Sequence, residues 1–330
     1  MEPEAEAQAE PDAKLVAQVA AHSTRQRPMP GDLHLDHVAH FVPDLDAAAD
    51  VLASLGFSLR PEFSQTTRVG EGLPRPAGAR VRMAMLAEGY IEIIQPVADT
   101  PRALRMRARM AGRAGIHLVS FGTPAAAAEH ARLQRHGFAP LPLVRHERQV
   151  PAAQGVLGAC YHVVHVPHDV MPEGRIEYTE HLTPAALWQD RWLDGLNAQC
   201  ALALVLLGAR DVAVTAARWA SFSGALPEPA ASGARLRLSR GQVLIRKASA
   251  GPMDTDPVGS ASSASSASSA ISACGLAIES PERLLDSLRR QGCAPLVVAP
   301  DLWSVILPGA LGGCWLFGRR SALDGMDQPA

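Results

Sequence analysis

Several features that would place this 330-residue chain in a familiar class are missing from its sequence. The formal net charge is only -2, which argues against a general binder of nucleic acids, because such proteins usually present a basic surface. No apolar run approaches the ~20 residues that a helix needs to cross a bilayer. The N-terminal stretch MEPEAEAQAEPDAK is acidic and lacks the basic and then apolar order of a secretory signal. We therefore expect a cytoplasmic protein that binds neither nucleic acid nor a membrane.

Cysteine is also scarce, and its spacing argues against two kinds of site. No CxxC pair occurs, so the sequence indicates neither a disulfide framework nor a structural zinc site. Hydrophobic residues make up 47% of the chain and charged residues 19%, which suits a folded protein with a substantial core, and the length suggests about two domains. We expect reduced and mostly buried thiols at Cys160, Cys200, Cys274, Cys293 and Cys314.

Parts of the chain have too little apolar content to pack. Residues 1–30 are rich in Ala, Glu, Pro and Gln and are predicted to form a disordered tail. Residues 251–272, a run of mostly Ser, Ala and Gly, are predicted to be a flexible insert within the C-terminal half. We expect a second, short tail at residues 321–330.

One order of predicted elements recurs between these stretches. LDHVAHF (residues 35–41) predicts a strand, and a helix follows that ends at Gly56-Phe57, before the strands VRMAMLA and YIEIIQP. GIHLVSF then begins a second copy, whose helix ends at Gly137-Phe138 and whose last strand, GRIEYT, matches GYIEII. The repeat indicates two related units of strand, helix and further strands.

Two weaker copies of this unit follow. CALALVLLG opens the third copy and SACGLAIES opens the fourth, each followed by a predicted helix and short strands. Four units taken in pairs predict an α+β protein with two similar domains. We place the first domain at residues 31–182, a linker at 183–199 and the second domain, which contains the insert, at 200–320.

The first predicted strand carries two histidines, His37 and His40. Side chains alternate between the two faces of a strand, so only one of these imidazoles can face a given site. The repeat aligns His117 with His37 and Ser120 with His40. The alignment therefore selects His37 as a candidate ligand and leaves His40 in a packing or surface role.

The last strand of each of the first two units carries a glutamate, Glu92 or Glu177. Two imidazoles and two carboxylates are a plausible ligand set for a divalent transition metal. The sequence therefore predicts one metal site made of His37, Glu92, His117 and Glu177, with Zn, Ni, Co or Mn as the ion.

The chain resembles a known superfamily. The four-unit order, the Asp36-His37 pair followed by VPDLD, and the YIEI strand are similar to the vicinal oxygen chelate superfamily, and within it to the glyoxalase-like domain proteins. The resemblance implies paired βαβββ units that form curled mixed sheets, with one metal on the concave face and the ligand order His-Glu-His-Glu. It covers residues 33–182 well. In the later units Ala203 stands near the histidine position and VLIR and CWLF lack the glutamate, so we expect a degenerate second domain without a metal.

The resemblance also implies a type of chemistry, in which a metal is chelated by adjacent oxygens of a small substrate. The ion would act as a Lewis acid toward an enediolate, while Glu92 or Glu177 could leave it and serve as the catalytic general base. We therefore expect an isomerase or lyase of glyoxalase type. Two alternatives stay open, an extradiol-type dioxygenase with non-haem Fe(II) and a non-catalytic metabolite- or drug-binding protein. A homodimer is also compatible with the sequence.

Other polar and aromatic residues have simpler interpretations. The arginines from Arg102 to Arg113 are predicted to form a solvated basic face, with an anionic-substrate clamp as the alternative. His181 shares a strand face with Glu177, which makes it a candidate neighbour of the ligands. Trp188 and Trp192 are expected to pack between the domains.

Overall fold

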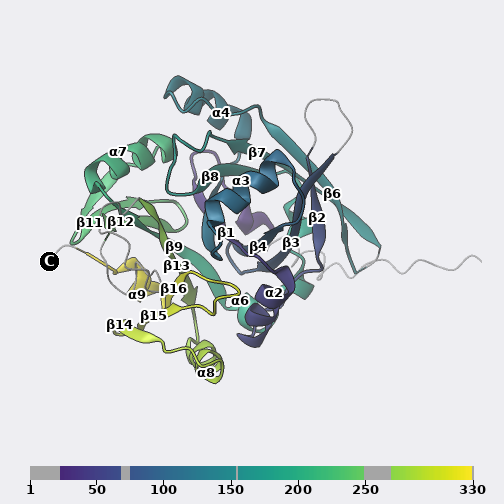
Figure 1. The fold of residues 1–330 in the computed structure, drawn as a ribbon. Coiled ribbons are helices and arrows are strands. Elements are labelled where there is room, and N and C mark those ends of the chain that lie inside the picture. The colour runs from purple at the N-terminus through teal and green to yellow at the C-terminus, as the bar shows by residue number, and fades with distance from the viewer. Residues whose placement is uncertain (1–22, 68–74, 154, 249–268, 329–330) are drawn as a thin grey trace, which may run out of the picture.

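The computed structural model describes residues 23–67, 75–153, 155–248 and 269–328, and the chain forms two eight-stranded sheets with helices around them (Figure 1). The first unit contains β1 (His34–Phe41), α2 (Leu45–Ser54), β2 (Phe63–Thr67), β3 (Arg75–Met85) and β4 (Tyr90–Pro96). After α3 (Pro101–Met110), the second unit contains β5 (Gly115–Gly122), α4 (Ala126–Arg135), β6 (Val144–Pro151), β7 (Val156–His165) and β8 (Arg175–His181).

The second half of the chain repeats this plan. Three short helical segments connect the halves, namely α5 (Pro184–Leu187), a 3₁₀ turn (Asp190–Trp192) and α6 (Gly195–Ala198). The third unit contains β9 (Cys200–Ala209), α7 (Val212–Ser223), β10 (Pro227–Ala230), β11 (Gly233–Arg237) and β12 (Gln242–Lys247). The fourth contains β13 (Ala270–Ile278), α8 (Glu282–Arg290), β14 (Leu296–Ala299), β15 (Leu302–Ile306) and β16 (Cys314–Gly318), and α9 (Arg320–Asp324) follows.

The two sheets share one topology. Their strand orders are β2-β3-β4-β1-β5-β8-β7-β6 and β10-β11-β12-β9-β13-β16-β15-β14. In each sheet the first strands of the two units pair antiparallel at the centre, and each pairs parallel with the last strand of its own unit. The predicted α+β fold of tandem βαβββ units in two curled mixed sheets is confirmed.

Local sequence explains where the helices begin and end. The Asp44 carboxylate accepts hydrogen bonds from the backbone N–H groups of Asp46 and Ala47 and so caps α2, which ends before Gly56 at φ +101°. Asp211 caps α7 in the same way, and Gly224 follows that helix at φ +76°. A left-handed residue at this position favours glycine, because a Cβ atom would clash there. No helix in the described part of the chain is long and apolar enough to span a bilayer.

The described residues reach into both predicted tails. Gln26 is fully buried and its amide binds Ala87 O and Gly89 N at the β3–β4 turn and the Arg240 guanidinium of the second domain. Leu323 of α9 is buried against the second sheet. Residues 251–268 of the predicted insert lie outside the described residues, and Ala270 already belongs to β13.

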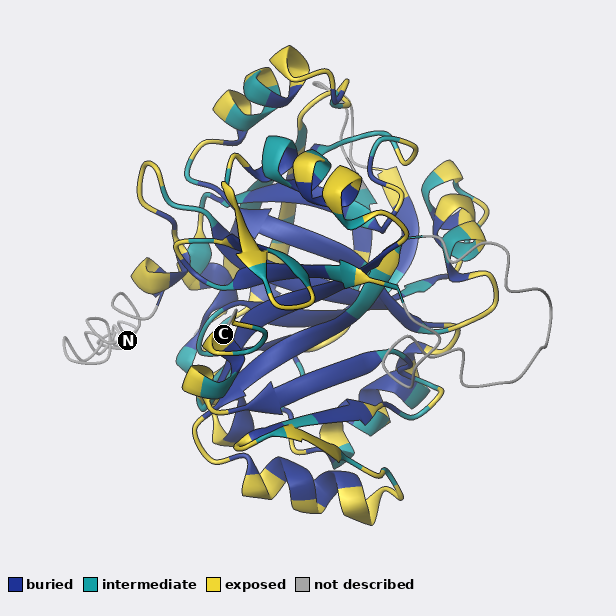
Figure 2. Ribbon diagram, turned by 90° about the vertical axis from the view of Figure 1, so that its left-hand side faces the viewer, coloured by how far each residue is buried: buried dark blue, intermediate teal, exposed yellow. Residues whose placement is uncertain are grey.

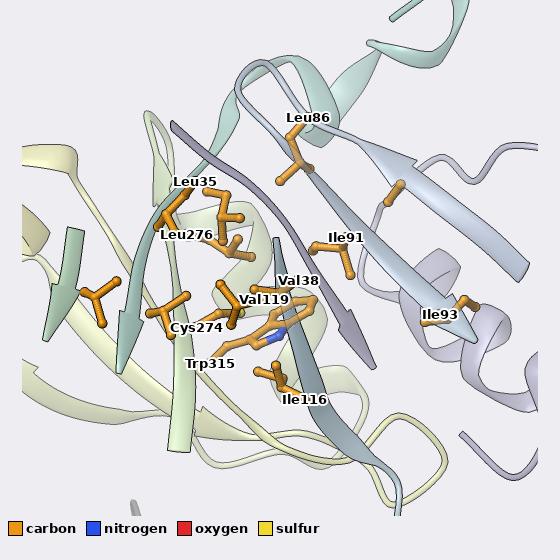
Figure 3. Close-up of a cluster of buried hydrophobic side chains, with 14 of the residues drawn as sticks. Leu35, Val38, Leu86, Ile91, Ile93, Ile116, Val119, Cys274, Leu276 and Trp315 are labelled. Atoms are coloured by element: carbon orange, nitrogen blue, oxygen red, sulfur yellow. The ribbon is translucent and has the colours of Figure 1, made fainter. Parts of the chain in front are cut away.

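The two sheets pack against each other through one face each. This interdomain core contains Leu35 and Val38 of β1, Val119 of β5, and Leu276 and Trp315 of the second sheet (Figure 3). Helices with exposed outer surfaces surround the buried strands (Figure 2). Burial of apolar surface is the main favourable contribution to such packing, and this shared core joins the two domains.

His40 is a fully buried polar group within this core. Its Nδ1 lies 3.1 Å from Leu311 O, and its Nε2 accepts a hydrogen bond from Trp315 Nε1 at 3.3 Å. Such a pattern needs the neutral imidazole with its proton on Nδ1. Burial lowers the pKa of His40 from 6.5 to about 4, although the carbonyl of Leu311 opposes the shift. The predicted packing role of His40 is therefore a hydrogen-bonded contact between the two domains.

We expect His40→Gln to make the protein less stable at pH 7 by about 1–3 kcal/mol, because a buried donor or acceptor loses its partner. Because the folded-state pKa of about 4 lies below the unfolded value of 6.5, neutral His40 stabilises fully above pH 6.5 and this contribution is lost as the pH falls toward 4. When the pH falls from 6.5 to 4, the free energy of unfolding of His40→Gln should therefore decrease less than that of the wild type. The expected difference is on the order of 3 kcal/mol.

Denaturant unfolding between pH 4 and 7 measures this difference. The exposed His136→Gln serves as the control and should keep the wild-type slope of stability against pH. An unchanged slope in His40→Gln would contradict the assignment.

Candidate active site on the concave face of the first domain

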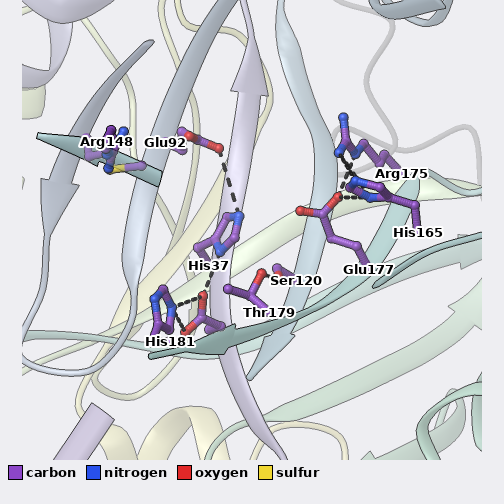
Figure 4. Close-up of polar contacts among 11 residues, drawn as sticks. His37, Glu92, Ser120, Arg148, His165, Arg175, Glu177, Thr179 and His181 are labelled. Atoms are coloured by element: carbon purple, nitrogen blue, oxygen red, sulfur yellow. Dashed lines mark hydrogen bonds and ion pairs between the residues drawn. The ribbon is translucent and has the colours of Figure 1, made fainter. Parts of the chain in front are cut away.

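The first sheet curls toward the face that does not contact the second domain. Its edge strands meet across that face, where His146 Nδ1 lies 3.0 Å from Thr66 O and the Arg148 guanidinium lies 3.5 Å from the centre of the Phe63 ring. Strand alternation places Val38 in the interdomain core and sends Ala39 and Phe41 to this concave face. Polar side chains from the central strands gather there (Figure 4).

Asp36, His37 and Glu92 form a chain of contacts at the centre of the concave face. His37 Nδ1 lies 2.8 Å from Asp36 Oδ2, and its Nε2 lies 3.9 Å from Glu92 Oε2. Asp36 also accepts a hydrogen bond from His181 Nε2 at 3.0 Å. All four side chains are almost completely buried. The carboxylate of Asp36 therefore fixes the ring of His37, and the free edge of the imidazole faces Glu92.

Burial and charge shift the pKa values of these groups in different directions. Burial raises the pKa of Glu92, and the attraction of His37 and Arg148 does not fully offset it. Burial opposes the charged form of His37, but the hydrogen bond and charge of Asp36 outweigh it and raise the pKa of the imidazole. Asp36 has a lowered pKa despite its burial, because His181 and His37 favour the carboxylate. Of Asp36 and Glu92, Glu92 is thus the carboxylate that takes up a proton more readily.

Glu177 lies on the same face but is held by other partners. Its Oε2 accepts a hydrogen bond from Arg175 Nε at 2.6 Å and lies 3.1 Å from His165 Nδ1. These contacts lower the pKa of Glu177 against the effect of burial. Its charge acts on the pKa values of both His37 and Glu92. Glu180 lies on the opposite face and accepts from Ala126 N, as strand alternation predicts.

A pair of β-bulges determines which side chains of the two central strands face the site. The β1–β5 register runs Leu35–Phe121, His37–Ser120, Ala39–Leu118 and His40–Ile116, so Asp36 and His117 are the unpaired extra residues. The bulge explains how two consecutive side chains, Asp36 and His37, meet on one face. His117 is thus the counterpart of Asp36, and Leu118 is the counterpart of His37. The structure shifts the sequence-based alignment of His117 with His37 by one residue.

The structure therefore brings the four predicted ligands together only in part. His37 and Glu92 are neighbours, and Glu177 lies nearby but is engaged by Arg175. His117 lies next to Phe41, and its pKa is lowered to about 4 by burial and by the nearby Arg109 and Arg113, although the backbone of Arg113 opposes the shift. Within the described ranges, no three His, Cys, Asp or Glu side chains form a ready-made metal-binding group.

Trp188 packs against the aromatic rings next to His37. It is fully buried and packs edge-on against His181 at 4.8 Å and Tyr90 at 5.8 Å between ring centres, while Tyr90 stacks on His37 at 4.3 Å. We expected this residue between the domains, but the linker returns across the concave face. We did not place Asp36 or Trp188 at the site from the sequence, although Asp36 stands next to His37.

The second domain has lost this polar face. By strand register, His37, Glu92 and Glu177 correspond to Leu204, Leu244 and Leu316. These leucines belong to an apolar cluster that also contains Leu323 of α9. Side chains of this kind bind neither a metal nor a polar substrate.

A cavity of about 780 Å³ lies at the junction of the linker and the second domain. Its lining includes the partly exposed ion pair of Glu88 with Arg320, whose side-chain atoms are 2.5 Å apart. We place the candidate site at the concave face instead, because coupled, buried titratable groups with shifted pKa values gather there.

Comparison with known proteins agrees with this fold. A family described as "Glyoxalase-like domain" matches residues 35–222. A hypothetical protein from Staphylococcus aureus has a TM-score of 0.59 at 11% identity, with 87% of this chain and 99% of that chain covered. A mutant of 4-hydroxymandelate synthase from Streptomyces coelicolor has a TM-score of 0.51 at 13% identity, with 90% and 97% covered. No curated protein matches significantly in sequence.

We expect Asp36→Asn to lower the pKa of His37, because the substitution removes the negative charge that stabilises the imidazolium. The protein should also lose about 2–4 kcal/mol of stability, since two buried histidines lose a charged partner. Histidine NMR titration and denaturant unfolding measure the two effects. The exposed Asp46→Asn is the control, with an expected loss below about 1 kcal/mol. A His37 pKa equal to wild type would show that Asp36 does not set its charge.

Proposed function

Because the chain belongs to the glyoxalase-like domain family of the vicinal oxygen chelate superfamily, we propose that it is a metal-dependent isomerase or lyase acting on a small oxygen-chelating substrate. The observation that supports this most directly is the contact chain of Asp36, His37 and Glu92 on the concave face. A buried carboxylate with a raised pKa beside an oriented imidazole is typical of sites that move protons.

The residues present fit a divalent ion in part. A carboxylate that binds the far nitrogen of a histidine is the usual support for a metal-ligating imidazole, and Asp36 occupies that position behind His37. His37 Nε2 and Glu92 would hold the ion, with Zn, Ni, Co and Mn as the candidates. Glu177 is a third candidate ligand that would first exchange its contact with Arg175. A divalent ion at this position supplies Lewis-acid polarisation of a substrate carbonyl.

Glu92 is the preferred general base, a role in which its carboxylate would leave the ion, and Glu177 is the weaker candidate. The raised pKa of Glu92 allows its carboxylate to accept a proton from a carbon next to a carbonyl and to return it later. Arg175 stabilises the charged form of Glu177 and so makes that carboxylate a poorer proton acceptor. Proton transfer through one carboxylate suits an isomerase or lyase that passes through an enediolate.

The Fe(II) dioxygenase alternative needs a second histidine beside His37 and one carboxylate. Two other histidines on this face are engaged, since His181 Nε2 binds Asp36 and His165 Nδ1 lies 3.1 Å from Glu177. These contacts favour the isomerase or lyase.

Elemental analysis of protein purified without added metal tests the proposal. We expect a divalent ion in the wild type and a loss of at least about 10-fold in metal content in His37→Ala and Glu92→Gln. His117→Ala is the matched control and should retain the wild-type content, because its imidazole lies beside Phe41 rather than Glu92.

Three other outcomes decide between the alternatives. Iron in the wild type would favour the dioxygenase. A wild type that binds no added metal would overturn the enzyme proposal in favour of a binding protein. Loss of metal in His117→Ala would restore the four-ligand site predicted from the sequence.

A further inference from the structure

Arginine side chains outnumber the free carboxylates at the concave face. Arg102 and Arg148 act on the pKa of Glu92, and Arg175 acts on that of Glu177. Asp36 is already balanced by His37 and His181. The charges of Arg102, Arg148 and Arg175 therefore act on two acidic groups, Glu92 and Glu177.

Arg102 occupies an unusual position in α3. It lies in the first turn of the helix, where a positive charge is unfavourable because the backbone N–H groups there already carry partial positive charge. The helix packs on the concave face through Met106 and Met110, and the charges of Arg175, Glu177 and Glu92 act on the Arg102 guanidinium. Its Nε is buried and has no hydrogen-bond partner among the residues that the structure describes. Arg105 of the same helix is exposed instead.

Arg148 reaches the site from β6. Its guanidinium lies over the Phe63 ring, and its Nη2 lies 3.4 Å from Met83 Sδ. Its Nε and Nη1 are buried and likewise have no hydrogen-bond partner in the described ranges. By contrast, Arg175 donates to Glu177 at 2.6 Å. An unpaired buried guanidinium is costly unless a ligand completes its hydrogen bonds.

Tyr161 is another hydrogen-bond donor on this face. Its ring stacks on His146 at 5.1 Å, and its hydroxyl is influenced by Arg148, Glu92, Arg102 and Glu177. Burial raises the pKa of Tyr161, so its hydroxyl keeps its proton and can donate a hydrogen bond. The charges of Arg102 and Arg148 thus act on both the Tyr161 hydroxyl and Glu92.

We propose that Arg102 and Arg148 bind an oxyanion of the substrate, a carboxylate or a phosphate, next to Glu92. The guanidinium group matches such planar or tetrahedral oxyanions with two parallel hydrogen bonds, and the unpaired nitrogens are available for them. This inference deepens the proposed function, on which it rests, by naming the substrate class as anionic. The basic helix face predicted from the sequence is thus divided, with Arg102 at the site and Arg105 in solvent.

Binding measurements on the full-length, EDTA-treated protein test the proposal. Calorimetric titrations use pyruvate in one arm and inorganic phosphate in the other, and the tighter ligand identifies the oxyanion. We expect Arg102→Gln and Arg148→Gln each to weaken binding by at least about 10-fold. Arg105→Gln, on the same helix, should bind as the wild type does.

Thermal stability separates a binding role from a structural one. We expect Arg102→Met to raise the unfolding midpoint by about 2–4 °C, because an unpaired buried charge is replaced by an apolar chain of similar length. Arg175→Met should lower the midpoint, since it leaves Glu177 without its guanidinium partner. A lower midpoint in Arg102→Met would show that Arg102 supports the fold and would overturn the proposal.

Oxyanion binding by the arginines does not require a bound metal. The titrations use protein from which metal has been removed, so loss of metal and loss of anion binding are separate failures. Oxyanion binding that is absent in the wild type, or that is unchanged in both Arg102→Gln and Arg148→Gln, would overturn the anion site. Such a result would leave the metal assay of the proposed function untouched.

Discussion

The face-to-face packing of the two curled sheets is the constraint on which the rest of the structure depends. One face of each sheet lies in the interdomain core, which contains Val38 and Trp315. In this core His40 accepts a hydrogen bond from Trp315 and so links the two domains. Only the opposite face of each sheet can then hold a polar site. In the second domain that face carries Leu204 and Leu244 instead of a histidine and a glutamate, so the candidate polar site lies in the first domain.

The concave face of the first domain tolerates many buried charges because most of them are paired. Asp36 balances two histidines, and Arg175 balances Glu177. The exceptions are the raised pKa of Glu92 and the unpaired nitrogens of Arg102 and Arg148. Departures of this kind weaken the folded state, so their concentration at one place is a physical argument for function there.

Much of the fold and part of the site follow from sequence patterns that act locally. Strand alternation separates His37 from His40 and Glu177 from Glu180, and both separations are observed. The repeated order of strand, helix and strands specifies the two sheets, because each unit forms its own pairing. Asp44 marks the start of a helix through its side-chain contacts with the next turn.

Only the tertiary structure decided which side chains from different strands meet on the concave face. The bulges at Asp36 and His117 change which residues of β1 and β5 face the site, and an alternation of period two cannot reveal an extra unpaired residue. Arg148 and Trp188 reach the site because the edge strands and the linker fold back over the concave face. The sequence by itself therefore determined the repeated units and the face of each central glutamate, while the curl and register of the finished sheet decided which side chains meet.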